Sequence, residues 1–134
     1  MALRGMPAPV ADFDTKEFWD ALARQLLLLP HCRVCDAARW PPGPICPHCW
    51  SDTTDWRAAP ASGRLYSWTI VRHPTHPALK GQVPYVIALA EFTDKVRLLG
   101  NIVNWTGEEL RDCQTVSVVY ETRDDGTPIY NFSI

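Results

Sequence analysis

Two pairs of cysteines constrain the fold of this chain more than any other feature of its sequence. Cys32 and Cys35 form one Cys-x-x-Cys pair, and Cys46 and Cys49 form a second pair after ten intervening residues. Each pair predicts a tight turn with both sulfurs on one side, and two such turns can face each other around a tetrahedral metal ion. Because four thiolates saturate zinc and leave no position for water or substrate, we predict a structural zinc site.

Iron is the alternative metal, because tetrathiolate sites accept zinc and iron alike. An iron site of the rubredoxin type would make the chain an electron carrier. Rubredoxin turns typically carry glycine after the second cysteine, whereas this chain has Asp36 and Trp50 there, so the sequence favours zinc. A zinc tetrathiolate would take the formal charge of the chain from −2 to about −4. We expect Arg33, Arg39 and backbone N–H groups to offset that charge locally.

Two histidines and a fifth cysteine are further candidates for metal chemistry. His31 and His48 lie beside the paired cysteines, and either could replace one of them as a ligand. We expect both to be exposed neighbours, because four cysteines already fill a tetrahedral site. Cys113 has no partner in the sequence, and we expect it to pack as a small apolar side chain at the start of a strand.

The size, charge and hydropathy of the chain narrow its class. It has 134 residues, enough for one domain or two very small ones. A net charge of −2 argues against a protein whose main role is to grip phosphate backbones, which needs a basic face. No run of about 20 apolar residues is present to span a membrane, and residues 1–14 lack the apolar core of a secretory signal. We therefore expect a cytoplasmic protein whose cysteines stay reduced.

The N-terminal part of the chain, residues 1–30, predicts a tail followed by one amphipathic helix. Residues 1–13 are rich in proline and alanine and are expected to be loose. The helix is predicted to begin at Asp14, with Asp14 and Glu17 forming a capping box, and to close in the apolar run 26–30. In most proteins such an apolar stripe packs into the hydrophobic core. Because so short a chain has a small core, contact of the stripe with another subunit is the alternative. The stripe comprises Phe18, Trp19, Leu22 and Leu26.

The second half of the chain alternates apolar and polar residues, which is the pattern of β-strands. A connector is predicted at residues 50–63, and "DDG" at residues 124–126 marks a hairpin turn. Thr106 and Glu109 match a capping box, which predicts a helical turn between the third and fourth strands. Five strands with a helix at that place follow the order of an OB-fold barrel, although SH3-like barrels also have about five strands. The strands are expected at residues 64–72, 84–92, 96–104, 114–122 and 128–134.

These patterns together predict a mainly β protein. The N-terminal tail and amphipathic helix occupy residues 1–30, and a rubredoxin-like zinc ribbon occupies residues 31–60. A five-stranded OB-fold barrel follows at residues 61–134.

No pattern in the sequence predicts a catalytic site. The chain lacks a Gly-x-Ser-x-Gly elbow, a P-loop and a dinucleotide fingerprint. One loop between the first two barrel strands gathers Arg72, His73, His76 and Lys80, and these potential cations could meet the phosphates of a ligand. A solvated loop is the alternative, because charged side chains on loops are usually surface residues.

The order of helix, four-cysteine ribbon and barrel resembles the acyl-CoA-associated zinc-ribbon/OB-fold family, also called domain of unknown function 35. The resemblance extends from residue 13 to residue 134. It departs from the family pattern at one place, because the family usually has a glycine-containing turn before the fourth barrel strand, where this chain reads "LRDCQTVSV". The matching stretches are "FWDALARQLLLLPHCRVC", "WPPGPICPHC", "SGRLYSWTIV", "PYVIALAEF", "VRLLGNIVN" and "VSVVYE".

The resemblance implies a non-catalytic accessory subunit of an acyl-CoA enzyme. Members of the family resemble partners of thiolases, MaoC-type enoyl-CoA hydratases and thiolase-like aldolases of steroid side-chain breakdown, which stabilise the enzyme and help form the acyl-CoA path. The four ribbon cysteines carry over as metal ligands, and no catalytic residue carries over. Within this hypothesis we expect a hetero-oligomer in which Arg72, His73 and Lys80 lie near a CoA phosphate, and Trp105 or Tyr85 lies at the partner surface.

A nucleic-acid-binding module is the alternative function, since OB-folds and zinc ribbons both serve that role. Trp68, Tyr66 and Tyr85 could stack against bases. The acidic balance of the chain and the lack of Lys or Arg at alternating strand positions argue against this alternative.

Overall fold

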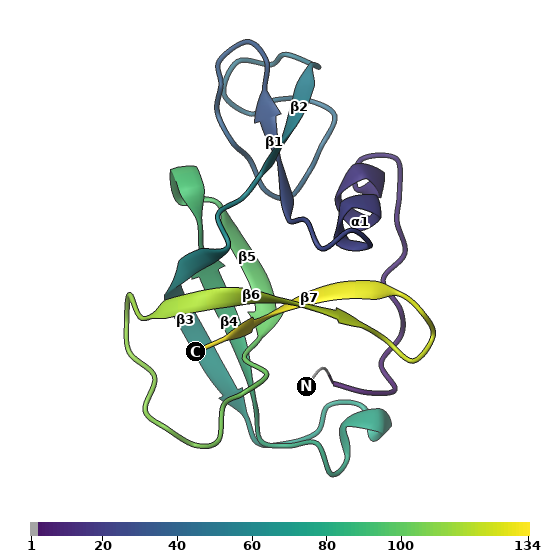
Figure 1. Ribbon diagram of the computed structural model, residues 1–134, viewed down its shortest axis with the longest axis vertical. Helices are drawn as coiled ribbons and strands as arrows, with labels where there is room; N and C mark the ends of the chain where they lie inside the picture. The colour runs from purple at the N-terminus through teal and green to yellow at the C-terminus, as the bar shows by residue number, and fades with distance from the viewer. Residues whose placement is uncertain (1–2) are drawn as a thin grey trace.

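The structure, a computed structural model, describes residues 3–134 except the side chain of Asp94, so residues 1–2 of the predicted tail lie outside it. A two-stranded sheet stands above a five-stranded barrel, and a short helix, α1 (Lys16–Leu22), lies beside the small sheet (Figure 1). The small sheet pairs β1 (Leu28–Cys32) with β2 (Thr54–Ala58) and forms the base of the ribbon. The barrel strands are β3 (Ser62–Val71), β4 (Tyr85–Glu91), β5 (Arg97–Asn101), β6 (Thr115–Thr122) and β7 (Pro128–Ser133).

The barrel contains all five predicted strands in the order of an OB-fold. Its strands neighbour one another in the order β5-β4-β3-β6-β7, and every pair is antiparallel. The barrel nearly closes where Ile102 bridges Phe132 and the Val103 N–H donates to the Phe132 carbonyl at 2.9 Å. Gly100 permits this approach, because a Cβ at that position would come within 2.7 Å of the Phe132 ring.

Strand β3 contains a bulge that interrupts the predicted alternation of residues 64–72. Its pairing with β4 shifts register between Leu65 and Ser67, so Leu65 is fully buried while Tyr66 is 46% exposed. The guanidinium carbon of Arg97 lies 3.6 Å from the centroid of the Tyr66 ring, which places a cation over one face of that ring.

Phe18 joins helix, ribbon and barrel in one core. Its ring centroid lies 4.7 Å from that of Trp40 in the ribbon and 5.7 Å from that of Tyr130 on β7. Phe18 and Leu22 are each 2% exposed and belong to the same hydrophobic cluster as the barrel residues. The alternative that the apolar stripe lies against another subunit is therefore wrong for these two residues, and Leu26, at 41% exposed, takes no part in the core.

The helix begins later than predicted and without the predicted cap. Its first residue is Lys16, and its N-cap residue Thr15 makes no side-chain capping bond, so the expected box of Asp14 and Glu17 is not formed. The Asp12 carboxylate instead accepts hydrogen bonds from the Thr15 backbone N–H at 2.9 Å and from its hydroxyl at 2.7 Å. No helix in the described part of the chain is long and apolar enough to cross a membrane.

The apolar run 26–30 was predicted to close the helix, and that prediction is wrong. The run leads into a strand instead. The helix ends at Leu22, and Gln25 adopts a left-handed backbone with φ 57°. The run ends at Pro30, and a residue before proline disfavours the helical conformation. The run therefore continues as strand β1, in which Leu29 is fully buried.

The predicted connector at residues 50–63 contains strand β2, so that prediction is wrong. The register of the small sheet places Thr54 opposite Cys32. The first four residues of β2 are half-buried and its last is exposed, which explains why the sequence shows no clear apolar alternation there.

The helical turn predicted at residues 106–110 is also absent. Gly107 has φ 118°, which is incompatible with a right-handed helix. The Glu108 carboxylate, and not that of Glu109, meets Thr106 and accepts bonds from its N–H at 2.8 Å and its hydroxyl at 2.9 Å. The OB-fold therefore rests on the order of its strands and not on a helix at this place.

The N-terminal tail, which was expected to be loose, is tied to the barrel. The Arg4 N–H donates to the side-chain oxygen of Gln82 at 2.8 Å, and the Gln82 amide donates back to the Arg4 carbonyl at 3.0 Å. Arg123, at the end of β6, donates to the Met6 carbonyl. These bonds hold a segment that has no helix or strand of its own between residues 3 and 13.

We expect Phe18→Ala to destabilise the chain by about 3–5 kcal/mol, because it empties a buried ring site between helix, ribbon and barrel. Urea unfolding followed by tryptophan fluorescence measures this loss. Phe13→Ala is the matched control, because Phe13 is 97% exposed, and it should leave the free energy of unfolding unchanged. Equal losses from the two substitutions would contradict the shared core.

Candidate metal centre

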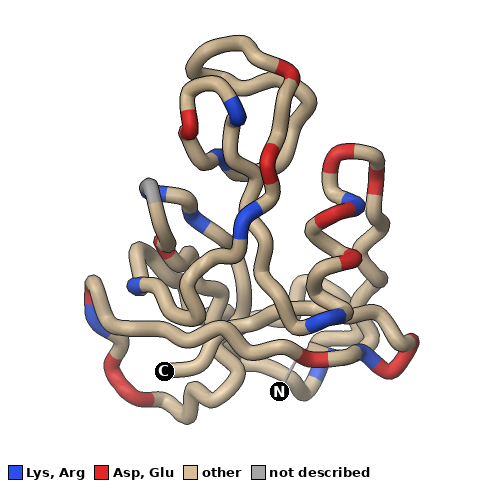
Figure 2. The backbone as a smooth tube through the Cα atoms, turned by 45° about the horizontal axis from the view of Figure 1, so that its top comes forward, with Lys and Arg blue, Asp and Glu red and all other residues tan. Residues whose placement is uncertain are grey.

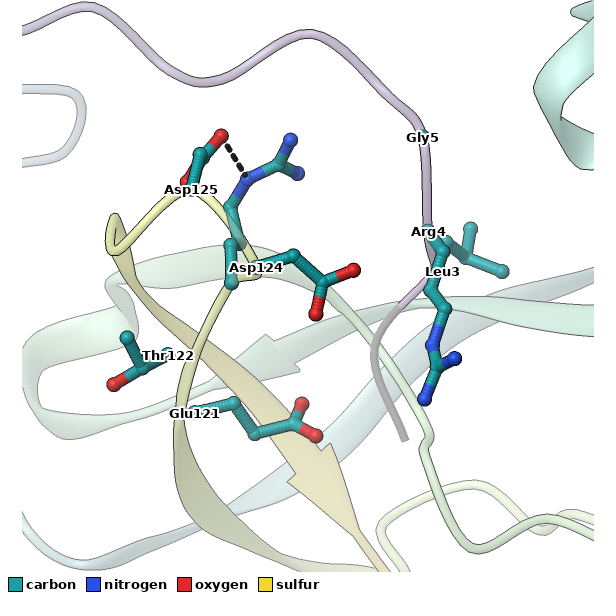
Figure 3. A pocket seen from close by; sticks show the side chains of 8 residues that line it. Leu3, Arg4, Gly5, Glu121, Thr122, Asp124 and Asp125 are labelled. Carbon is teal, nitrogen blue, oxygen red and sulfur yellow. Dashed lines mark hydrogen bonds and ion pairs between the residues drawn. The ribbon is translucent and has the colours of Figure 1, made fainter.

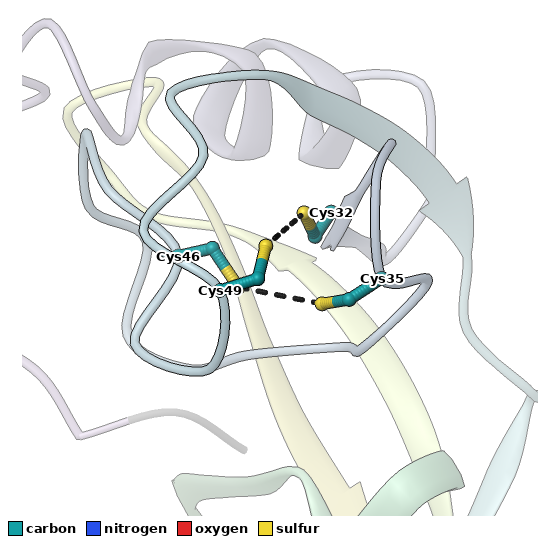
Figure 4. Close-up of side chains that lie close together, drawn as sticks. All are labelled: Cys32, Cys35, Cys46 and Cys49. Carbon is teal, nitrogen blue, oxygen red and sulfur yellow. Dashed lines mark hydrogen bonds between the residues drawn. The ribbon is translucent and has the colours of Figure 1, made fainter.

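The four paired cysteines converge on one point in the ribbon. Their sulfurs all lie within 4.8 Å of one another, and Figure 4 shows the four side chains pointing inward from the two turns. Cys32 Sγ lies 3.5 Å from Cys49 Sγ, and Cys35 Sγ lies 3.6 Å from Cys46 Sγ. A tetrahedral ion with metal–sulfur bonds of about 2.3 Å places its sulfurs about 3.8 Å apart. The cluster therefore has the dimensions that a tetrathiolate zinc ion needs.

The two cysteine turns share one backbone hydrogen-bond pattern. In the first turn the Cys32 N–H donates to the Ala37 carbonyl at 2.9 Å. In the second turn the Cys46 N–H donates to the Ser51 carbonyl, again five residues on, at 2.8 Å. The backbone thus builds two equivalent cradles, one for each cysteine pair.

The residue after each cysteine pair has a left-handed backbone. Asp36 and Trp50 both have φ 64°, and their N–H groups donate to the carbonyls of Cys32 and Cys46 at 3.0 and 2.9 Å. This is a conformation that glycine adopts at no steric cost, so the turns keep the geometry of glycine-containing turns without glycine. The missing glycines therefore do not separate zinc from iron.

Hydrogen bonds, burial and the neighbouring sulfurs give the cysteine thiols different pKa values. The backbone N–H of Cys35, opposed by burial and helped by the N–H of Val34, lowers the pKa of Cys32 to about 6. The Ser51 N–H lowers the pKa of Cys49, but the neighbouring sulfurs and burial outweigh it and raise that pKa to about 12. A cation is therefore needed before all four sulfurs can carry negative charge together.

The two histidines beside the cysteines do not belong to the four-sulfur cluster. His48 is exposed, as expected. His31 is 6% exposed, so the expectation of an exposed neighbour is wrong for this residue. Its Nδ1 lies 3.1 Å from the Leu29 carbonyl, within strand β1.

Two arginines meet at Thr54, the residue paired with Cys32 across the small sheet. Arg33 Nε donates to the Thr54 carbonyl at 3.1 Å, and Arg39 Nη2 donates to the Thr54 hydroxyl and, at 3.1 Å, to the Gly43 carbonyl. Arg39 is 6% exposed, and its Nε and Nη1 have no hydrogen-bond partner among the described residues. A buried cation needs compensating negative charge, and a zinc tetrathiolate carries about −2. The position of Arg39 therefore agrees with the role expected for it.

The residues expected near CoA and those expected at the partner surface do not all line one described cavity. Arg72 and Trp105 line one cavity of about 510 Å³. His73 and Lys80 are exposed on the loop that follows Arg72, and neither lines that cavity. Tyr85 shares a different cavity, of about 250 Å³, with Trp105.

Cys113 does not pack into the barrel, contrary to expectation. The residue is exposed and adopts φ 59° in the turn before β6. Its N–H donates to the Leu65 carbonyl at 3.0 Å, so its backbone supplies the contact with β3. Cys113 thus takes a left-handed conformation, which glycine adopts at no steric cost.

Another cavity, of about 290 Å³, lies between the N-terminal segment and the hairpin of β6 and β7 (Figure 3). Glu121, Asp124 and Asp125 line it, and Arg123 forms an ion pair with Asp125 at 3.2 Å. None of the predicted site residues lines this cavity, and its carboxylates make it unsuitable for a phosphate.

Two known domains match the chain in the order in which the structure arranges its lobes. Residues 19–55 match the rubredoxin-like zinc ribbon domain of ChsH2, and residues 56–121 match the C-terminal OB-fold domain of ChsH2. The chain belongs to the ChsH2/DUF35 family. The expected family, zinc-ribbon fold and OB-fold are thereby confirmed.

Proteins of known name or structure are similar to most of this chain. A solved chain described as "Ltp2-ChsH2(DUF35) aldolase" has TM-score 0.85 and 32% identity, covering 94% of this chain and 98% of its own. A probable enoyl-CoA hydratase alpha subunit of Thermomonospora curvata is 39% identical over 97 residues, which are 72% of this chain and 30% of that protein. A DUF35 domain-containing scaffold protein of Methanocaldococcus jannaschii is 29% identical over 114 residues, covering 81% of this chain and 80% of that protein.

The sequence predicted the four clustered cysteines. It did not predict Thr54, which pairs with Cys32 across the small sheet and accepts hydrogen bonds from two arginines. Thr54 fell within the predicted connector, and only its pairing with Cys32 places it at the ribbon. The aromatic Trp56 in the same polar segment was a signal for a half-buried strand.

We expect the purified chain to carry one zinc ion, and Cys46→Ser to lose it and unfold the ribbon, because the binding energy of a structural zinc is folding energy. Elemental analysis and circular dichroism measure the two effects. Cys113→Ser is the matched control, since Cys113 is exposed and outside the cluster, and it should keep the metal. Visible absorbance and one equivalent of iron would instead identify a rubredoxin-type centre.

We expect Arg39→Met to weaken zinc binding about tenfold, which is about 1.4 kcal/mol, because it removes the buried cation bound to Thr54, the residue paired with Cys32. Competition with a chromophoric chelator measures the change. Arg33→Met is the control, because Arg33 is exposed and bonds only to the Thr54 backbone carbonyl, and it should change affinity much less. Equal effects of both substitutions would show that burial of the charge does not matter.

Proposed function

We propose that this chain is a non-catalytic scaffold subunit of an acyl-CoA enzyme complex, with a thiolase, a thiolase-like aldolase or a MaoC-type enoyl-CoA hydratase as its partner. The observation that carries the proposal is the likeness of both lobes to the ChsH2 chain of an Ltp2 aldolase, at 32% identity over 94% of this chain. The names of two further relatives, a scaffold protein and an enoyl-CoA hydratase alpha subunit, support it. The processes that this role would serve include breakdown of steroid side chains.

The chemistry of the metal centre supports a structural rather than a catalytic role. In the proposal Cys32, Cys35, Cys46 and Cys49 hold zinc, and all four of its positions are taken by sulfur. Such an ion cross-links the ribbon, residues 31–60, and offers no open position to a substrate. The tail and helix at 1–30, the outer surface of the ribbon and the barrel at 61–134 then supply the surfaces that a partner could contact.

The cavity beside Arg72 supports a limited contact with acyl-CoA. Arg72 could meet a phosphate, while His73 and Lys80 on the adjoining loop could add positive charge. Glu108 and Glu109 line the same cavity and oppose an anion deeper inside it. In the proposal the CoA phosphates therefore touch only the loop side of the cavity, and the acyl group lies in the partner enzyme.

The surface of the barrel gives little support to the alternative of a nucleic-acid-binding module. Tyr66, one of the aromatic residues expected to stack on bases, already has one face covered by Arg97. Arg64 and Arg97 both form ion pairs with the Glu91 carboxylate, so two cations of this face are neutralised. A stacking platform with a basic groove is not formed there.

Co-expression with the host's Ltp2-type aldolase or enoyl-CoA hydratase tests the proposal. We expect the two proteins to co-elute in size-exclusion chromatography, and the enzyme to be more soluble and more active with this chain than alone. The isolated, zinc-loaded chain should turn over no acyl-CoA thioester in the same assay. Turnover by the isolated chain, or an enzyme that is fully soluble and active without it, would contradict the proposal.

A further inference from the structure

A cavity of about 460 Å³ lies between the ribbon and the segment that leads into α1. Its apolar walls are Phe13, Pro42, Pro44 and Trp56, and we call it the ribbon–helix cleft. The apolar stripe of α1 does not fill it, because Phe18 turns into the core. Phe13 itself is 97% exposed, so this apolar side chain has almost no cover from the described residues.

Two further exposed apolar side chains of the ribbon are close in sequence to residues that line the cleft. Ile45, 45% exposed, directly follows the wall residue Pro44, and Trp50, 80% exposed, lies two residues before the lining residue Asp52. Trp50 also has φ 64°, a backbone conformation that bulky side chains rarely adopt. The cysteine turn accounts for this backbone, whereas the exposed ring buries little surface in the chain itself, and tryptophan is enriched among the residues that anchor protein interfaces.

The charged rim of the cleft is acidic. Asp14, Glu17 and Asp52 line it, and Figure 2 shows acidic residues gathered along α1 and the segment before it. The rim cation Lys16 is paired with Asp20, and Arg39 lies buried beneath with its Nη2 engaged by Gly43 and Thr54. A ligand that complements this surface therefore combines an apolar side chain with positive charge.

We propose that the ribbon–helix cleft is the docking surface for the enzyme subunit, and that the enzyme inserts an apolar side chain flanked by Lys or Arg. The identity of the partner rests on the proposed function, whereas the location and chemistry of the surface rest on the exposed apolar residues and the acidic rim. Nucleic acid and the phosphates of CoA are repelled by the rim. A symmetric dimer of this chain would bring two acidic rims together, which favours a different protein as the occupant.

Affinity measurements with substituted chains test this surface. The host's Ltp2-type aldolase is immobilised, and binding of the zinc-loaded full chain is followed by biolayer interferometry. Phe13→Ala combined with Trp50→Ala should weaken binding at least tenfold, because such anchors carry a large share of interface energy. Both side chains are exposed, so zinc content and thermal unfolding should stay as in the unsubstituted chain.

Leu99→Ala is the matched control for apolar exposure. Leu99 is 62% exposed and lines a different cavity that shares no residue with the cleft. This substitution should change the affinity less than twofold.

Charge supplies an independent readout of the same surface. Binding of the unsubstituted chain should weaken as salt is raised, because an acidic rim meets basic residues. Asp14→Asn combined with Glu17→Gln should weaken binding at low salt and reduce the salt dependence. A merely structural role of these two carboxylates would not change the salt dependence.

The possible outcomes separate this inference from the function on which it rests. If the unsubstituted chain binds and the Phe13/Trp50 variant binds equally well, the docking surface lies elsewhere while the scaffold role stands. If the unsubstituted chain binds no aldolase or hydratase, the proposed function and the inference both fail. Concentration-dependent self-association that the same substitutions abolish would show that the cleft receives a second copy of this chain, and would overturn the inference.

Discussion

The convergence of four sulfurs within 4.8 Å is the constraint on which the upper lobe depends. The two-stranded sheet of β1 and β2 is too small to be stable by itself. The long segment between those strands gains its form from two backbone cradles that aim cysteine pairs at each other. A metal ion at their centre would replace the hydrophobic core that a lobe of this size cannot build. Arg39 is buried and bonds to Thr54, the residue paired with Cys32, where its positive charge would offset the negative charge of the thiolates.

The ribbon is coupled to the barrel through packed rings and not through a flexible linker alone. Phe18 contacts Trp40 of the ribbon and Tyr130 of β7, so the helix packs against both lobes. Because Pro42 and Pro44 follow Trp40 along the chain, the same contacts position one wall of the ribbon–helix cleft. The proposed metal site and the proposed docking surface therefore belong to one arrangement, in which a bound metal would fix the segment that the partner would meet.

Several predictions from local sequence signals failed where packing outweighed those signals. The capping boxes at Asp14 and Thr106 matched a pattern but formed no helix start, because Asp12 bonds Thr15 and Gly107 leaves the helical region. The run 26–30 is apolar enough for a helix end, yet Pro30 and pairing with β2 make it a strand. A sequence pattern indicates the conformational propensity of a segment, whereas the segments that pack or pair with it decide which conformation it adopts.

The sequence by itself determined which four cysteines cluster in the ribbon and which segments form the barrel strands, because cysteine spacing and two-residue alternation are local geometric signals. It also allowed the family to be recognised. Only the tertiary structure decided that Asp36, Trp50 and Cys113 take left-handed backbones, since turn patterns assign that conformation to glycine. The tertiary structure alone also placed Thr54 between Cys32 and two arginines, and Phe13 beside the prolines of the ribbon. These are contacts between segments far apart along the chain, and no local pattern encodes which distant segments will meet.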